Sequence, residues 1–321
     1  MKKNVAIIMG GYSSEYDISI KSGEVVYKTL KKEKKLNLFR VIITKEKWYH
    51  IDNYNKKYEV DKRTFQIIKE NNCIKFDLVF NTIHGIPGEN GEIQSYLNSL
   101  NIKQTSSNSS EASLTFNKSK CKNAVEKFGI NIPKSIVIKK NDSIDTNNIL
   151  SLLKLPLFIK PNKGGSSFGI SRVTNQKNII KALNNCFNED NEALIEEEIV
   201  GREITVGVIK YQNKIIALPP TEIISHNTFF DFNAKYKGES DEITPAKLNK
   251  NEEKIVKKIA IDIYMKLNLN GFSRSDFILK NGKFYFLEIN TNPGLTNESI
   301  LPQQAQAANI SLNELFNSVI D

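Results

Sequence analysis

Cysteine is scarce in this sequence of 321 residues, and the few cysteines are widely separated. The three of them, Cys73, Cys121 and Cys186, are odd in number and lack the close spacing of disulfide frameworks and zinc sites. This spacing argues against a disulfide-stapled secreted domain and against a zinc finger, and it fits a chain that works in a reducing cytosol.

Long apolar runs and a secretory leader are also lacking. No stretch is long and apolar enough to cross a bilayer, and the first residues lead directly into a strand pattern. We therefore expect a cytoplasmic protein that does not insert into a membrane.

Positive charge is plentiful, with a formal net charge of +9, but it is not concentrated. The lysine pairs are scattered among polar residues, and no basic stripe carries interleaved aromatic residues. That pattern is not typical of nucleic-acid binding, so we expect no nucleic-acid partner. A positive surface also favours small anionic substrates such as phosphorylated molecules.

The order of apolar runs predicts three consecutive parts. Hydrophobic residues at 40% and charged residues at 25% are ordinary globular values, and the length exceeds that of one typical domain. Residues 1–105 alternate strands and helices, which predicts an α/β domain with a doubly wound sheet. The expected strands cover 5–9, 39–43 and 76–81, the expected helices 18–30 and 92–100, and the residues between 43 and 76 read as a polar passage.

The remainder predicts α+β structure. The serine-rich stretch 106–113 reads as a linker, and residues 106–199 form a central subdomain with a helix at 117–128. Strands are expected at 157–160, 170–173 and 193–196. Residues 200–321 form a strand-rich subdomain with strands at 203–211, 214–219, 271–279 and 283–289, a helix at 252–266 and a helical C-terminus.

The most informative segment is a predicted hairpin near residue 280. Two apolar runs flank Lys280-Asn281-Gly282-Lys283, and they carry Asp276 and the pair Glu288 and Asn290. Alternate residues of a strand share a face, so Glu288 and Asn290 point the same way. Asp276 joins them only if the turn holds an odd number of residues, so we expect a three-residue loop with Gly282 in the left-handed conformation. Two carboxylates and an amide oxygen on one face predict a magnesium site rather than a solvated hairpin end.

Two glycine-rich segments favour a nucleotide, although neither has a dinucleotide or Walker pattern. Gly10-Gly11 follows the first strand without the Gly-x-Gly-x-x-Gly spacing. The loop 164–169 lies between two expected strands, and Lys160 ends the strand before it. Glycines permit backbone amides to approach phosphate closely, so the loop and Lys160 together predict a triphosphate site.

In order and spacing, the motifs of this chain resemble those of the D-alanine–D-alanine ligases of the ATP-grasp superfamily. The matching segments span almost the whole sequence: Gly10-Gly11-Tyr12-Ser13-Ser14-Glu15, His84-Gly85, Gly88-Glu89-Asn90-Gly91, Ile159-Lys160-Pro161, residues 164–169, residues 229–236, Arg274 with Asp276, and residues 287–294. The resemblance implies a preATP-grasp domain followed by a two-subdomain ATP-grasp fold. It also implies ATP-dependent ligation of two D-alanine molecules through an acyl phosphate, for peptidoglycan precursor synthesis and cell-wall formation.

The resemblance assigns the nucleotide and metal ligands. Asp276, Glu288 and Asn290 match the ligands of Mg²⁺, for which Mn²⁺ may substitute. The remaining matches are to residues that bind ATP, and they are Lys118, Lys160, Ser166, Ser167, Glu196, Glu197, Ile199, Glu203 and Lys235. Glu198 stands where relatives often carry an aromatic or apolar residue beside the adenine.

The resemblance also assigns the amino-acid sites and an oligomeric state. Glu15 and His84 match the side that holds the first D-alanine, while Ser299 and the amide of Ile300 match the grip on the second carboxylate. Arg274 and the amide of Gly294 match the groups that stabilise the oxyanion. Ser166 and Tyr236 match a catalytic link to a mobile loop, in which tyrosine goes with D-alanine as second substrate. Family members are usually homodimers, so a homodimer is expected.

Two other interpretations remain open. The first is another ATP-grasp carboxylate–amine ligase or a D-alanine–D-lactate ligase, although Tyr236 argues against lactate. The second is a non-catalytic ATP-binding regulator, against which the intact set of Asp276, Glu288, Asn290 and Arg274 argues.

Overall fold

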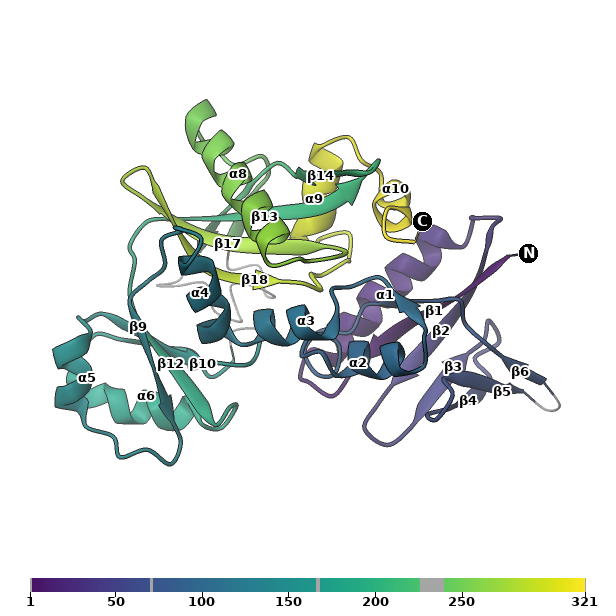
Figure 1. Cartoon of the computed structure of the whole chain (residues 1–321), viewed down its shortest axis with the longest axis horizontal. Helices are drawn as coiled ribbons and strands as arrows, with labels where there is room; N and C mark the ends of the chain where they lie inside the picture. Colours follow the sequence, from purple (N-terminus) through teal and green to yellow (C-terminus); the bar gives the residue numbers. More distant parts are fainter. Residues whose placement is uncertain (1, 70–71, 166–167, 226–239, 321) are drawn as a thin grey trace.

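The chain is described by a computed structural model that covers residues 2–69, 72–165, 168–225 and 240–320. Figure 1 shows a sheet-and-helix domain beside the two termini, a small α+β module at the opposite end of the molecule, and a third sheet between them. None of the described helices is long and apolar enough to cross a membrane.

The N-terminal sheet is parallel in its centre. Within the described residues it has eight strands in the order β6-β5-β4-β3-β2-β1-β7-β8, of which β2, β1, β7 and β8 pair in parallel. Its elements are β1 (Lys3–Gly10), α1 (Tyr16–Leu30), β2 (Leu36–Ile43), β3 (Trp48–Ile51), β4 (Lys57–Asp61), β5 (Gln66–Lys69), β6 (Asn72–Ile74), β7 (Leu78–Asn81), α2 (Glu92–Ser99) and β8 (Lys103–Gln104). The parallel half is the doubly wound unit that the sequence predicted.

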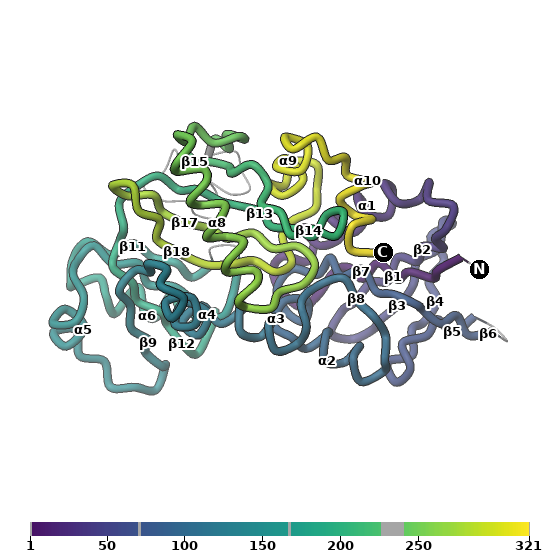
Figure 2. Tube along the Cα trace, turned by 45° about the horizontal axis from the view of Figure 1, so that its top comes forward, coloured from purple at the N-terminus to yellow at the C-terminus, as the bar shows by residue number. Residues whose placement is uncertain are grey.

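Both faces of this sheet are covered, because alternate residues of β1 point to opposite sides. Ile7 and Met9 pack in one core with α1 and with the C-terminal helices α9 (Ile300–Ala307) and α10 (Leu312–Asn317). Ala6 and Ile8 pack in a second core with α2. The end of the chain therefore returns to its beginning, as Figure 2 also shows, and Lys3 Nζ donates to the Ile320 carbonyl at 2.8 Å.

Two segments differ from the prediction. The polar passage after β2 is not irregular: it forms β3 to β6, which extend the sheet with antiparallel pairs. These strands are short and mostly exposed, so they lack the apolar alternation by which strands are recognised. The serine-rich stretch is not simply a linker either, because helix α3 (Ser109–Phe116) begins within it.

The central module is a four-stranded antiparallel sheet in the order β11-β10-β12-β9. Helices α5 and α6 pack on one face of it. Helix α4 leads into the module. The elements are α4 (Lys118–Glu126), β9 (Ser135–Lys139), α5 (Thr146–Leu152), β10 (Leu157–Pro161), β11 (Ser171–Val173), the short 3₁₀ helix η1 (Gln176–Asn178), α6 (Ile179–Cys186) and β12 (Glu192–Glu197).

The third sheet is antiparallel and follows the order β16-β15-β13-β17-β18, with β14 paired to β13. Helices α4 and α8 pack on one face of it, and α8 begins with a capping box formed by Asn249 and Glu252. The elements are β13 (Arg202–Tyr211), β14 (Lys214–Ala217), β15 (Thr221–Ser225), β16 (Ser240–Ile243), α8 (Lys250–Lys266), β17 (Ser273–Lys280) and β18 (Lys283–Asn290). Strands β15 and β16 had not been predicted. Each of the three sheets lies within one predicted part of the chain, although the boundaries at 105 and 199 stay a prediction.

Candidate active site

Two neighbouring cavities open around the third sheet. The first, of about 320 Å³, lies between the N-terminal domain and the ends of β17 and β18, and we call it the inter-domain cleft. The second, of about 170 Å³, lies between the central sheet and the third sheet, and we call it the inter-sheet cleft. Arg274 and Glu288 line both cavities, so the two clefts meet at the β17–β18 hairpin.

The hairpin brings the three predicted metal ligands to one face. Asp276 pairs directly with Glu288, and Arg274 pairs with Asn290. Residues opposite one another on neighbouring strands share a face, and so do residues two apart on one strand, so these side chains form one polar row.

The predicted three-residue turn is wrong. Lys280 pairs with Lys283, so the turn holds only Asn281 and Gly282, with φ values of 50° and 73°. Two positive φ values identify a type I′ turn, which Asn-Gly favours. The extra residue lies instead in a β-bulge, because the pairing register shifts between Asp276 and Phe277. The bulge supplies the odd count that places Asp276 beside Glu288.

Cations accompany the carboxylates of this row. Arg274 donates from Nε and Nη2 to the two carboxylate oxygens of Asp276 at 3.0 and 2.9 Å, and Thr205 Oγ1 donates to Asp276 Oδ1 at 2.5 Å. Lys118 Nζ lies 3.3 Å from Glu288 Oε2 and donates to the Gly164 carbonyl at 2.5 Å. Lys118 therefore connects the glycine-rich loop of the central module to the hairpin.

The donor set of the row fits a hard cation. It offers two carboxylates and the amide oxygen of Asn290 on one face, and oxygen ligands are those that Mg²⁺ and Mn²⁺ prefer. No group of three His, Cys, Asp or Glu side chains suited to a metal occurs in the described part of the chain, and the third oxygen donor of this row is the amide of Asn290. Such a sparse set suits an ion that is held partly by phosphate oxygens.

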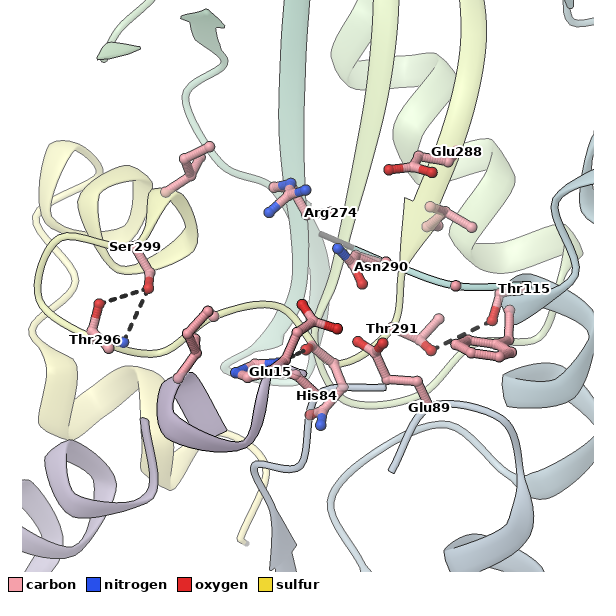
Figure 3. Close-up of a pocket in the computed structure, with 18 of the residues that line it drawn as sticks. Glu15, His84, Glu89, Thr115, Arg274, Glu288, Asn290, Thr291, Thr296 and Ser299 are labelled. Carbon is pink, nitrogen blue, oxygen red and sulfur yellow. Dashed lines mark hydrogen bonds between the residues drawn. The ribbon is translucent and has the colours of Figure 1, made fainter. Parts of the chain in front are cut away.

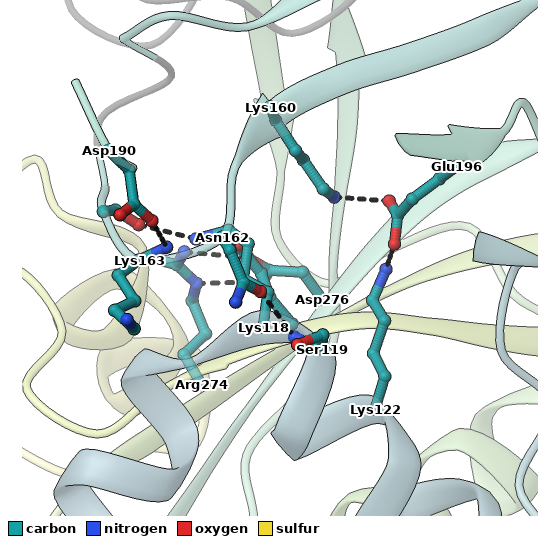
Figure 4. A network of polar contacts seen from close by, with 12 residues as sticks. Lys118, Ser119, Lys122, Lys160, Asn162, Lys163, Asp190, Glu196, Arg274 and Asp276 are labelled. Atoms are coloured by element: carbon teal, nitrogen blue, oxygen red, sulfur yellow. Dashed lines mark hydrogen bonds and ion pairs between the residues drawn. The ribbon is translucent and has the colours of Figure 1, made fainter. Parts of the chain in front are cut away.

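A buried ion-pair triad lies beside the inter-sheet cleft (Figure 4). Glu196 holds Lys160 Nζ at 2.6 Å through Oε2 and holds Lys122 through Oε1. Burial lowers the pKa of Lys160 from 10.5 to about 8. Burial, followed by the charge of Lys160, keeps the pKa of Lys122 well below its ordinary value. The triad places two cations on one carboxylate.

The rest of the inter-sheet cleft is apolar with carboxylates at its edge. Its apolar wall comes from both sheets and consists of Pro133, Phe158, Ile170, Ile199, Ile278 and Leu287. Glu197 and Glu203 also line it, so five of the residues predicted to bind ATP lie in one cavity: Lys160, Glu196, Glu197, Ile199 and Glu203. Glu198 is not among the lining residues; it forms a bidentate pair with Arg172 at 2.8 Å instead. A cavity that offers both apolar side chains and carboxylate acceptors suits a purine and a ribose.

Four polar residues of the N-terminal domain line the inter-domain cleft: Glu15, Lys21, His84 and Glu89, of which Glu15, His84 and Glu89 are labelled in Figure 3. Glu15 is the N-cap residue of α1 and is 9% exposed. A β-carbon on Gly165 would come within 3.0 Å of Glu15 Oε2, so the glycine-rich loop passes close to this carboxylate. Glu89 lies in the same cleft and accepts from the Gly85 amide at 3.0 Å.

His84 is held at both ring nitrogens. Nδ1 lies 3.0 Å from the Asn292 carbonyl, and Nε2 lies 3.1 Å from Ser22 Oγ. The carbonyl can only accept, so Nδ1 carries the proton and Ser22 donates to Nε2. Ser22 Oγ also accepts from the Leu295 amide at 3.3 Å. His84 and Ser22 therefore fix the loop 292–295 to α1, which is a supporting role, although His84 also lines the cleft as predicted.

The far end of the inter-domain cleft is the start of α9. Ser299 is the N-cap residue of this helix, and its Oγ accepts from the Thr296 amide at 3.1 Å. A β-carbon on Gly294 would lie 2.7 Å from Ser299 Oγ, so a larger residue here would displace the Ser299 side chain. Gly294, Ser299 and Ile300 all line the cleft, where a helix N-terminus favours a carboxylate.

Comparison with known families explains this arrangement. A family model described as "D-ala D-ala ligase N-terminus" matches residues 4–107, and one described as "D-ala D-ala ligase C-terminus" matches residues 124–321. The chain belongs to the D-alanine–D-alanine ligase family. It is thus an enzyme, and the predicted ATP-grasp architecture is confirmed.

Relatives of this ligase match it along its whole length. The D-alanine–D-alanine ligase of Christiangramia forsetii is 47% identical over 321 residues, which cover 100% of this chain and 98% of the relative. That of Flavobacterium johnsoniae is 46% identical over 319 residues, covering 99% and 98%. Among solved structures, the VanG D-Ala:D-Ser ligase from Enterococcus faecalis has a TM-score of 0.89 at 30% identity, covering 100% and 99%. The D-alanine–D-alanine ligase from Bacillus anthracis complexed with ATP has a TM-score of 0.79 at 28% identity, covering 99% and 96%.

Four predicted residues of this ligase lie outside the described residues. They are Ser166 and Ser167 of the glycine-rich loop, and Lys235 and Tyr236. Their assignments, including the specificity attached to Tyr236, stay predictions.

Sequence reasoning missed several residues of the site. Glu89 belongs to the matching segment Gly88-Glu89-Asn90-Gly91, but no role was predicted for it. Its position in a glycine-rich loop, five residues after His84, could have indicated a place in the site. Thr205 could not be found, because it meets Asp276 only through the pairing of β13 with β17. Lys122 had one signal, its place one helical turn after Lys118.

Proposed function

We propose that this ligase joins two D-alanine molecules to D-alanyl-D-alanine, with ATP converted to ADP and phosphate. In the first step the carboxylate of one D-alanine takes the terminal phosphoryl group of ATP and becomes an acyl phosphate. In the second step the amine of another D-alanine attacks the acyl carbon, the new C–N bond forms and phosphate leaves. Such a reaction supplies the dipeptide for peptidoglycan synthesis in the cytoplasm, and we extend the proposal to a homodimer.

The meeting of the two clefts at Arg274 and Glu288 carries this proposal. A nucleotide in the inter-sheet cleft points its phosphates toward the same hairpin residues that an amino acid in the inter-domain cleft reaches with its carboxylate. Phosphoryl transfer depends mainly on such positioning and on charge stabilisation. The structural neighbour from Bacillus anthracis is complexed with ATP, which supports ATP as the donor.

Each group has a defined task in this proposal. Lys118 and Lys160 bind phosphate oxygens, and Glu197, Ile199 and Glu203 hold the nucleoside. Asp276, Glu288 and Asn290 would hold Mg²⁺ or Mn²⁺, which when bound neutralises charge on the transferring phosphoryl group.

The amino-acid side of the proposal uses the inter-domain cleft. The Glu15 carboxylate holds the ammonium of the first D-alanine, while Ser299 and the Ile300 amide hold the carboxylate of the second. Arg274 and the Gly294 amide stabilise the negative oxygen that develops on the acyl carbon. His84 supports the loop that carries Gly294. Ser166, Ser167 and Lys235 keep their predicted part in binding ATP, and Ser166 and Tyr236 keep their predicted catalytic link, in which tyrosine goes with D-alanine as second substrate.

A second candidate acceptor is D-serine, because the VanG structure with a TM-score of 0.89 is named a D-Ala:D-Ser ligase. The test measures ADP release with ATP and Mg²⁺ in the presence of D-alanine, D-alanine with D-serine, D-alanine with D-lactate, or L-alanine, and identifies each product by mass. We expect D-alanyl-D-alanine from D-alanine alone. Preferential formation of D-alanyl-D-serine or of a depsipeptide would contradict D-alanine as the second substrate. ATP binding without any product would favour the alternative that the protein is a non-catalytic regulator.

A further inference from the structure

Lys122 is a buried charged residue without a role in the reaction described so far. Its side chain is 1% exposed, and neither cleft, as lined by described residues, includes it. It leaves helix α4 one turn after Lys118, so the two lysines lie on the same face of the helix. Lys118 reaches the third sheet at Glu288, whereas Lys122 reaches the central sheet at Glu196.

The contacts of Glu196 show what Lys122 does. One carboxylate oxygen holds Lys122, and the other holds Lys160 at 2.6 Å (Figure 4). Glu196 and Lys160 line the inter-sheet cleft, whereas Lys122 stands behind them. Lys122 therefore touches the carboxylate from the side away from the cavity.

The charge balance of the triad distinguishes the two lysines. A buried carboxylate with a single cation would hold that cation strongly, because the interior screens charge weakly. With two cations, the carboxylate keeps a partner when one lysine turns to another anion. Only Lys160 is placed to do so, because only Lys160 faces the cleft. Burial lowers the pKa of both lysines, and the charge of Lys160 lowers the pKa of Lys122 further.

We propose that Lys122 is a positioning residue for the nucleotide: it is the fixed counter-ion of Glu196 and so leaves Lys160 available to the phosphate groups. The inference rests on the proposed ATP site in the inter-sheet cleft. Without Lys122, Glu196 would hold Lys160 for itself and would present an uncompensated negative charge to a polyanion.

The test replaces Lys122 with methionine, which keeps the length of the side chain and removes its charge. We expect Lys122→Met to raise the Kd and the KM for ATP by roughly 10- to 100-fold, with a smaller change in kcat and an unchanged KM for D-alanine. Lys120→Met is the matched control, because Lys120 is exposed on the same helix. Lys122→Arg keeps the charge and should recover part of the ATP affinity.

A double variant separates positioning from a purely structural role. Glu196→Gln removes the carboxylate that Lys122 neutralises, so adding Lys122→Met to it should change ATP affinity by less than about twofold. The double variant removes one charge of each sign and leaves no unpaired carboxylate, so this comparison stands even if Lys122→Met alone fails to fold. An undiminished loss in the Glu196→Gln background, or wild-type ATP affinity in Lys122→Met, would overturn the proposal.

The experiment also distinguishes this inference from the proposed function. Calorimetry of wild-type protein with ATP and Mg²⁺ comes first, and an absence of binding there would contradict the proposed ATP site itself. Binding by the wild type together with full coupling between positions 122 and 196 supports both proposals. Binding by the wild type without that coupling contradicts only the role of Lys122.

Discussion

The two clefts share Arg274 and Glu288 but are built from different kinds of contact. Beside the inter-domain cleft, the clearest described contacts are the neutral hydrogen bonds that run from Leu295 through Ser22 to His84 and Asn292. The inter-sheet cleft has ion pairs beside it, namely Lys122 and Lys160 with Glu196 and Arg274 with Asp276, and the pair of Lys118 with Glu288 lies where the two clefts meet.

The difference follows from what each cleft is proposed to bind. A zwitterionic amino acid brings little net charge, so its cleft needs fixed loops at set positions. A nucleotide with a metal ion brings several charges at once, so its cleft needs cations and carboxylates that can exchange partners. A buried charge that loses its partner costs more than an unmade neutral hydrogen bond, so a buried cation can change partners only when the anionic ligand replaces the carboxylate it leaves. Changes in one cleft should therefore affect one ligand more than the other.

The largest effect is expected where the two clefts meet. Glu288→Gln removes a carboxylate from the proposed metal site while keeping the size of the side chain. Loss of charge stabilisation worth several kcal/mol should lower kcat by about 10²- to 10³-fold. Steady-state ADP release at varied Mg²⁺ measures it, with Glu126→Gln, exposed on α4, as the control. Wild-type turnover with unchanged Mg²⁺ dependence would contradict the assignment of Glu288 as a metal ligand.

A change confined to the inter-domain cleft should separate the ligands. Ser22→Ala leaves the Leu295 amide and His84 Nε2 without their buried partner, which should lower the free energy of unfolding by about 2–4 kcal/mol. The loop 292–295 loses its attachment to α1, so the KM for D-alanine should rise while the Kd for ATP stays unchanged. Denaturant titration and ATP calorimetry measure the two, with Ser99→Ala at the exposed end of α2 as the control. An equal loss of ATP affinity would show that the clefts are not independent.

The sequence predicted the polar row of the hairpin because alternation on a strand is a local property. Glu288 and Asn290 were placed correctly for that reason, whereas the bulge beside Asp276 was mistaken for a longer turn. A bulge leaves no mark on residue type within a run that is apolar throughout, as residues 284–287 of β18 are. The Asn-Gly pair was the better guide to the turn.

Ion pairs of the inter-sheet cleft were harder to predict than the motifs, because they join distant segments. Lys122 and Glu196 are 74 residues apart, and a lysine amid polar neighbours resembles any surface lysine. Strands β4 to β6 were missed because their exposed polar residues hide the alternation. The parallel strands β1 and β7, buried on both faces, were found at once.

The pH dependence of ATP affinity should test the role of charge in the inter-sheet cleft. Lys160 has a pKa lowered by burial to about 8, and only its protonated form attracts phosphate. ATP affinity should therefore be full below this pH and fall about tenfold for each pH unit above it, until binding no longer depends on Lys160. Calorimetry between pH 7 and 9.5 measures this without the ionisation of the D-alanine amine.

Lys160→Arg is the matched control for that titration, because a guanidinium stays charged across this range. Its ATP affinity should not vary with pH in the window where the wild type loses affinity. A flat wild-type profile, or an identical decline in Lys160→Arg, would assign the effect to another group.

The smallest effect is expected on the face of β17 that points away from the two clefts. Ser275 is fully buried between Arg274 and Asp276 in sequence but faces away from them, and its Oγ has no hydrogen-bond partner among the described residues. Ser275→Ala removes that unpaired hydroxyl, so it should raise the free energy of unfolding by up to about 1 kcal/mol and leave both KM values unchanged. Thr205→Val is the contrasting variant, because the Thr205 hydroxyl donates to Asp276 on the cleft side and its loss should destabilise the protein. Denaturant midpoints at constant m value measure both. A loss of stability in Ser275→Ala would contradict this prediction. It would show that the hydroxyl makes a stabilising hydrogen bond to buried water.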